Sequence, residues 1–162
     1  MVGLAWVLGL IGDDLPKGDI RELGETAHVS AGELIGGLLL IRLIWLMISR
    51  PPKDIPLHVG GLGAYAGKLA HITLYGLLFG VVATGITLQF AWGESLSILG
   101  FYEIASPWVR DKAFAHTVEE IHELFAHSLI ILATIHAGAA LIHHFIFKDA
   151  TLKRMLPLTL EE

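Results

Sequence analysis

The sequence predicts an all-α membrane protein, a four-helix transmembrane bundle in which the first helix is truncated. Of its 162 residues, 54% are hydrophobic, and the mean hydropathy is +0.64. Charged residues make up 17%, against about 25% in an average soluble domain. Three apolar segments are long enough to cross a bilayer, which takes about 20 residues. We expect one transmembrane domain over residues 1–162.

Composition also excludes several kinds of chemistry. The chain has no cysteine, which excludes disulfides, thiolate nucleophiles, cysteine-ligated iron–sulfur clusters and covalently attached haem. A net charge of −5 offers no basic surface to nucleic acid. The segment after Met1 lacks the basic start and the small-residue cleavage site of a signal peptide. Any haem must therefore be held by coordination and packing.

The first apolar segment, residues 1–12, is partial. As a helix it would extend about 18 Å, less than the roughly 30 Å hydrocarbon core. It is either an interfacial segment or the second half of a spanning helix. Residues 27–50 form the first complete span, in which Gly32 and Gly36 are spaced to let another helix or a flat macrocycle approach the backbone.

Two more spans follow, at residues 68–90 and 119–147. Between them, residues 91–117 form a polar loop rich in aromatic residues. Trp and Tyr favour the headgroup region, so we expect part of this loop to lie on the membrane surface as a short helix.

Basic residues predict the orientation, because Lys and Arg gather on the cytoplasmic side. They flank the ends of three spans: Arg50, Lys53, Lys68, Lys148, Lys153 and Arg154. This distribution places the C-terminus in the cytoplasm. His28 and His122 then lie near the outer face of the membrane, and His136 lies nearer the inner face.

Two histidines of the last span predict a function. His122 and His136 are fourteen residues apart, so they point within about 40° of each other and are separated by about 21 Å along the helix. Ionisable residues inside a span usually mark a functional site. The pattern predicts one ligand for each of two haems stacked across the bilayer, each needing a second histidine from another helix. His28, at the level of His122, makes a His28–iron–His122 bridge plausible.

The other polar residues of the spans have simpler explanations. We expect packing or snorkelling for a set of histidines at or near span ends, and packing for a fifth inside the last span: His58, His116, His143, His144 and His127. Arg42 is either a counter-ion for a haem propionate or an arginine that snorkels to the inner interface. Glu33 is either a proton relay or a partner of a nearby histidine or arginine.

Several segments resemble the bacterial cytochrome b561 family of four-helix membrane cytochromes. They are AHVSAG around His28, LAHITLYGLLF around His71, IHELFAHS around His122, and IHAGAALIHHFIFKDATLKRMLP from His136 onward. The resemblance implies two b-type haems, an outer one held by His28 and His122 and an inner one held by His136 and a first-helix histidine. That last histidine would fall before Met1, so we expect one complete site and an N-terminally truncated chain. His71, His143 or His144 could substitute, with no reason to prefer one.

The leading hypothesis is a bacterial inner-membrane b-type cytochrome that transfers electrons, since bis-histidine ligation leaves no open axial position. The resemblance implies an outer-side donor, including superoxide, and ubiquinone as acceptor, which makes a superoxide:quinone oxidoreductase the enzyme activity to test. Basic candidates near the outer haem are Arg21, Arg110 and Lys112. Candidates near the quinone are Lys68, His71 and Arg42.

Two other classes of protein stay open. One is a cytochrome b membrane-anchor subunit that passes electrons from a partner dehydrogenase or hydrogenase to quinone. The other is a haem-free structural protein. A homo-oligomer also stays open.

Overall fold

The computed structural model describes residues 1–49, 61–98 and 100–146. Over those ranges the chain is mostly helical, with a short 3-10 turn after the first helix and one two-stranded hairpin. The four helices are α1 (Val2–Ile11), α2 (Asp19–Ile48), α3 (Gly61–Ala91) and α4 (Lys112–Phe145). His58 and the basic residues used for the orientation, apart from Lys68, lie outside the described residues.

Three of the helices are long and apolar enough to cross a membrane. These spans are Asp19–Ile48, Tyr65–Ala91 and Lys112–Phe145, with mean hydropathies of 1.9, 1.8 and 1.8. Helix α1 has 10 residues, about 15 Å of helix, and does not cross the bilayer by itself. The predicted all-α, four-helix membrane fold is confirmed. Each long helix begins about two turns before its predicted segment, because the residues that precede each segment are also helical. They are polar before α2 and α4 and mostly glycine and alanine before α3.

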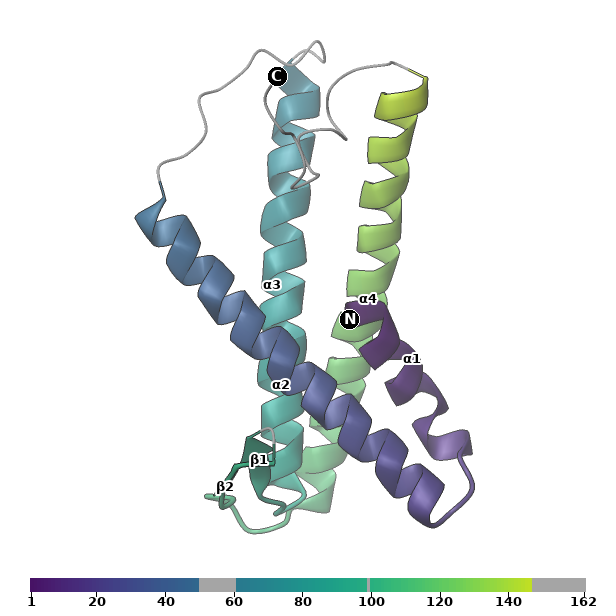
Figure 1. The fold of residues 1–162 in the computed structure, drawn as a ribbon, viewed down its shortest axis with the longest axis vertical. Helices are drawn as coiled ribbons and strands as arrows, with labels where there is room; N and C mark the ends of the chain where they lie inside the picture. The colour runs from purple at the N-terminus through teal and green to yellow at the C-terminus, as the bar shows by residue number, and fades with distance from the viewer. Residues whose placement is uncertain (50–60, 99, 147–162) are drawn as a thin grey trace.

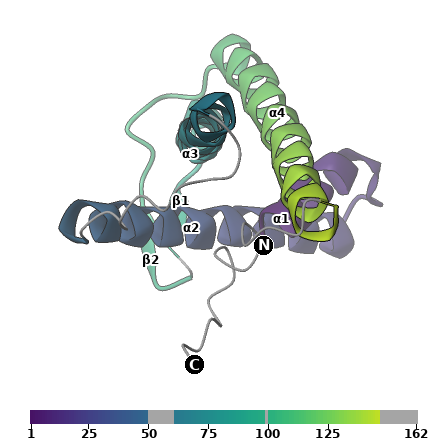
Figure 2. The ribbon, with the colours of Figure 1, turned by 90° about the horizontal axis from the view of Figure 1, so that it is seen from above.

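Helices α3 and α4 run antiparallel and make the most extensive contact in the molecule. In Figure 1 they stand side by side, and α2 crosses them obliquely. Figure 2 shows α2 lying across one side of the α3–α4 pair. Helix α1 turns back along α2 and contacts α4, beside the half of α4 that begins at Lys112 (Figure 1). Helices α3 and α1 are thus the direct neighbours of the N-terminal half of α4.

Glycines allow two of these close contacts. A Cβ at Gly80 of α3 would lie 2.7 Å from Cδ2 of Phe125 on α4, and one at Gly36 of α2 would lie 3.0 Å from Cγ1 of Val82 on α3. Real Cβ atoms essentially never come within 3.0 Å of another atom. Gly32 has nothing within 4 Å of its Cβ position, so of the glycine pair expected to admit a close neighbour, only Gly36 does.

The loop between α3 and α4 contains a hairpin, and the expected surface helix is wrong. Gly93, with φ of 75°, ends α3; its N–H donates to Phe90, and the next N–H, of Glu94, donates to Gln89, which closes the helix as a Schellman motif. Strand β1 (Leu96–Ile98) then pairs antiparallel with β2 (Tyr102–Ile104). The β-branched residues of this stretch favour strands.

The start of α4 is fixed by a side chain. Asp111 accepts a hydrogen bond from the backbone N–H of Phe114 at 3.1 Å, the contact that makes aspartate a good helix N-cap. This cap lies about three turns before His122. It therefore sets where the histidines of α4 lie relative to the hairpin.

The apolar surface is turned outward. The buried apolar residues of the described part are mostly small or sit at helix crossings: Ala5, Ile35, Leu39, Ala91, Leu96, Ala115, Val118, Leu129 and Ala140. Large side chains at the end of α2 are exposed instead, such as Met47 at 86% and Ile48 at 76%. Such a surface suits lipid as the surrounding solvent, because lipid tails are as apolar as these side chains.

Candidate functional site

His28 of α2 and His122 of α4 face each other across the bundle. Their ring centres are 6.2 Å apart, and the ring planes lie at 78°. Both residues are half-buried, in the part of the bundle where α1, α2, α3 and α4 come together. The sequence places these histidines at the same membrane level, and the fold places their rings opposite each other.

The spacing of this pair fits one metal atom between two imidazoles. Metal–imidazole bonds are about 2 Å long, and a ring centre lies about 1 Å beyond its nitrogen, so two rings on opposite sides of one iron have centres about 6 Å apart. The observed 6.2 Å matches that value. With no cysteine in the chain, imidazole is the ligand through which this site can hold a haem iron.

Hydrogen bonds settle which nitrogen of each ring is available. Nδ1 of His28 lies 2.8 Å from the carbonyl oxygen of Ala5. A carbonyl can only accept, so this nitrogen carries the hydrogen and Nε2 keeps a lone pair. Fixing the second nitrogen of a metal-binding histidine in this way sets both its tautomer and its ring orientation.

His122 is fixed by the same logic. The hydroxyl of Thr84 on α3 donates to the carbonyl of Gly80 at 2.7 Å, and its oxygen lies 3.0 Å from Nδ1 of His122. With its single hydrogen on the Gly80 carbonyl, the hydroxyl oxygen can accept from Nδ1–H of His122. Nε2 of His122 is therefore the free nitrogen as well. Thr84 and the carbonyl of Ala5 are functional groups that the sequence analysis missed.

Two glycines leave room for these rings. A Cβ at Gly9 of α1 would lie 3.0 Å from Cε1 of His28, and one at Gly85 of α3 would lie 3.3 Å from Cε1 of His122. Larger residues at these positions would push the imidazoles from their present places. The Nε2 lone pairs, the 6.2 Å spacing of the rings and the space left by the two glycines all fit a haem held by two histidines.

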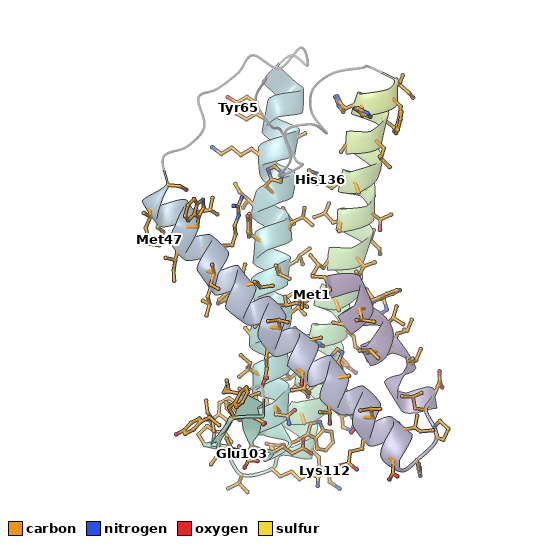
Figure 3. The ribbon with its side chains drawn as sticks, viewed as in Figure 1. Met1, Met47, Tyr65, Glu103, Lys112 and His136 are labelled. Atoms are coloured by element: carbon orange, nitrogen blue, oxygen red, sulfur yellow. The ribbon has the colours of Figure 1, made fainter. Side chains whose placement is uncertain are left out.

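A second pair of imidazoles lies further along α4. His136 contacts His71 of α3, with ring centres 5.0 Å apart and ring planes at 69°. Figure 3 shows the labelled His136 between α3 and α4, above the level of Met1. Of the three histidines that could substitute for the missing partner of His136, the structure thus brings His71 to it. His144 contacts Phe145.

Arg42 lies near the same level of the bundle. Its Nε donates to the hydroxyl of Tyr75 at 3.2 Å, and Tyr75 is one turn beyond His71 on α3. A hydroxyl thus accepts from this membrane-embedded guanidinium. Tyr75 is a further residue that the sequence analysis did not single out.

Two of the remaining histidines and two of the basic candidates have local partners. Nδ1 of His127 bonds the carbonyl of Glu123 one turn back at 2.7 Å, and its ring meets Trp6 of α1. His116 pairs with Glu119 at 3.2 Å. Arg110 stacks on Trp92, 4.7 Å from the ring centre, and Arg21 donates to the carbonyl of Gly12. Within the described ranges, no three His, Asp or Glu side chains gather as a metal-ligand set.

The family of this chain follows from its similarity to known proteins. A family model described as prokaryotic cytochrome b561 matches residues 1–158. The chain belongs to the prokaryotic cytochrome b561 family. Membership makes it a b-type membrane cytochrome, a class of protein whose cofactor is haem b.

Individual relatives agree with the family model. The chain is 36% identical over 129 residues to cytochrome b561 homolog 2 of Escherichia coli (strain K12), covering 80% of this chain and 68% of that protein. It is 36% identical over 144 residues to cytochrome b561 homolog 1 of the same strain, covering 88% and 80%. The probable superoxide oxidase CybB of Yersinia pestis is 32% identical over 139 residues, covering 82% and 74%.

Proposed function

We propose that this cytochrome b561 protein carries electrons from a donor on the outer side of the membrane to quinone in the bilayer. His28 and His122 bind one haem iron through Nε2, and His136 supplies one ligand to a second haem nearer the other side. Haem b supplies one-electron redox chemistry when it is bound. The observation that carries the proposal is the 6.2 Å spacing of the His28 and His122 rings, with both Nδ1 atoms already engaged.

The residues around the first site hold the two imidazoles and limit access to them. The Ala5 carbonyl and the Thr84 hydroxyl keep each ring turned toward the other. With His28 and His122 both binding its iron, a bound haem would have no ligand position left for dioxygen and would supply electron transfer only.

Superoxide is the donor that we propose, on the strength of the relative named a probable superoxide oxidase. Two superoxide anions give one electron each and leave as two molecules of dioxygen. Ubiquinone takes both electrons together with two protons and becomes the quinol. Arg110 and Lys112, just before and at the start of α4, supply positive charge that would attract an anionic donor.

For the quinone we propose a place beside His136, where Arg42 and Tyr75 are joined by a hydrogen bond and Lys68 lies on the same helix as His71. These groups can donate to a quinone oxygen. We also propose that the C-terminus is cytoplasmic, as the basic residues of the sequence suggest. A fluorescent reporter fused to the C-terminus tests that orientation.

The first experiment measures haem per chain in the purified full-length protein, by the pyridine haemochrome method. We expect His28→Ala and His122→Ala to lose the same haem, and the double variant to lose no more than either alone. His127→Ala is the matched control, because His127 is on the same helix and bonds its own backbone. Full haem content in His28→Ala would overturn the assignment of this site.

A second experiment tests the donor. The protein is placed in ubiquinone-containing vesicles, and an enzymatic source of superoxide is added outside. We expect the haem to become reduced and quinol to accumulate, and superoxide dismutase to abolish both signals. If neither signal appears until a partner dehydrogenase or hydrogenase is added, the protein is a membrane anchor subunit and the superoxide proposal is wrong.

A further inference from the structure

Among the residues that the structure describes, the contact between His71 and His136 is the pairing of imidazoles that the proposed ligands do not explain. His136 is half-buried on α4, and His71 is exposed on α3. Their ring centres are 5.0 Å apart, more than an ångström closer than those of His28 and His122. This difference in ring spacing bears on whether His71 is a second iron ligand or a hydrogen-bonding partner of His136.

One role is that of a second iron ligand. Two rings on opposite sides of one iron have centres about 6 Å apart, so the His71–His136 pair is too close to hold an iron between its rings. The other role is hydrogen bonding. When an imidazole N–H donates to the nitrogen of a second imidazole at about 2.9 Å, with each ring centre about 1 Å behind its nitrogen, the centres are about 5 Å apart. In this structure the rings meet in a T-shaped contact and no hydrogen bond joins them. The spacing is too short for an iron between the rings, and short enough for a hydrogen bond to form once the rings turn toward each other.

The fold supports this role at the level of the helices. Along α4, His136 follows His122 by fourteen residues, about 21 Å. Along the antiparallel α3, His71 precedes Thr84 by thirteen residues, about 20 Å in the same direction in space. Helix α3 therefore presents one hydrogen-bonding side chain to each of the two histidines of α4, and for His122 that side chain is already the acceptor for Nδ1–H.

We propose that His71 is a positioning residue for His136. In the haem-loaded protein its ring accepts a hydrogen bond from Nδ1–H of His136, which leaves Nε2 of His136 for the iron. The inference rests on the proposed role of His136 as a ligand, and it needs no particular group on the far side of that iron. An acceptor behind a ligating imidazole raises the basicity of the ligand, and a more basic ligand favours ferric over ferrous iron.

The test compares redox titrations and haem content of four full-length variants. We expect His136→Ala to lose one haem. His71→Ala should keep that haem but raise its midpoint potential, because the acceptor is gone, while the potential of the His122-dependent haem stays unchanged. His71→Gln, whose amide oxygen can accept, should move the potential back toward that of the unaltered protein. Ile72→Ala, an exposed neighbour on α3, is the control and should match the unaltered protein.

Each of the remaining outcomes would contradict either the positioning role of His71 or the ligand role of His136. If His71→Ala has the same haem content and potentials as Ile72→Ala, His71 does not position His136, and the proposed function stands. If His71→Ala loses the haem as completely as His136→Ala, His71 is an iron ligand and the positioning role is wrong. If His136→Ala loses no haem, the ligand role of His136 fails and the inference fails with it.

Discussion

A histidine binds metal well only when its second nitrogen has a defined partner, and at the first site that partner differs between the two rings. One is a backbone carbonyl, at Ala5, and the other is a hydroxyl, at Thr84. Sequence spacing identified His28 and His122 as a pair because span order and helix periodicity place them at one level. It could not identify Thr84 or Ala5, and it could not choose His71 over the other candidate partners of His136. Which residues of neighbouring helices meet depends on crossing angles that a periodic pattern does not contain.

A substitution at Gly9 tests whether the space beside His28 positions the imidazole ring. Its Cβ position lies 3.0 Å from the His28 ring, so Gly9→Val should displace the imidazole and reduce haem content by about one haem per chain, measured by pyridine haemochrome. Gly3→Val is the control, because it is on the same helix with nothing within 4 Å. Equal haem content in both variants would mean that this contact does not position His28.

The helices differ in how well their sequence defines them. Apolar runs located the cores of α2, α3 and α4, because a membrane span must satisfy its own backbone hydrogen bonds. The starts of α2 and α4 lay in polar residues that hydropathy does not count, such as Asp19 at the start of α2. The hairpin between α3 and α4 escaped prediction for a different reason. Its strands, Leu96–Ile98 and Tyr102–Ile104, are shorter than any window in which an alternating pattern can be recognised.

The packing of α3 on α4 depends on Gly80. Gly80→Val would bring side-chain atoms into Phe125, whose ring lies 2.7 Å from the Cβ position. We expect a loss of about 1–3 kcal/mol, typical of overpacking, seen as a lower melting temperature in detergent. Adding Phe125→Ala should cost less in the Gly80→Val background than in the unaltered protein, because contacting residues are coupled.

The comparison for this prediction is Gly76→Val, one turn earlier on α3, where nothing lies within 4 Å. The same residue type is introduced there with the same loss of glycine flexibility. If Gly76→Val lowers the melting temperature as much as Gly80→Val does, the effect comes from helix propensity and not from the contact with Phe125.

The whole molecule has a sparse interior. No large side chain in the described part is fully buried, and the buried set contains four alanines. The sequence predicted the membrane class from hydropathy and the electron-transfer class from histidine spacing. It did not predict how few residues pack inside, because a hydrophobic side chain that faces lipid and one that faces a neighbouring helix have the same hydropathy.

We therefore expect bound haem to contribute strongly to stability. A ligand that binds only the folded protein adds about 2.7 kcal/mol when its concentration is a hundred times its dissociation constant. Protein made under haem limitation should melt at a lower temperature in detergent, and added hemin should restore the higher value. His28→Ala combined with His122→Ala should show a smaller restoration. A melting temperature independent of haem would show that helix packing alone holds the bundle.

Helix α4 runs without a break from Lys112 to Phe145, and it carries both His122 and His136. The number of peptide units between these residues is constant, so their separation of about 21 Å is set by covalent geometry and helix rise. A thinner or thicker bilayer makes spanning helices tilt, and tilting changes how they lie against one another. It cannot stretch this interval. The distance between His122 and His136 along the helix is therefore the same in every membrane that accepts the protein.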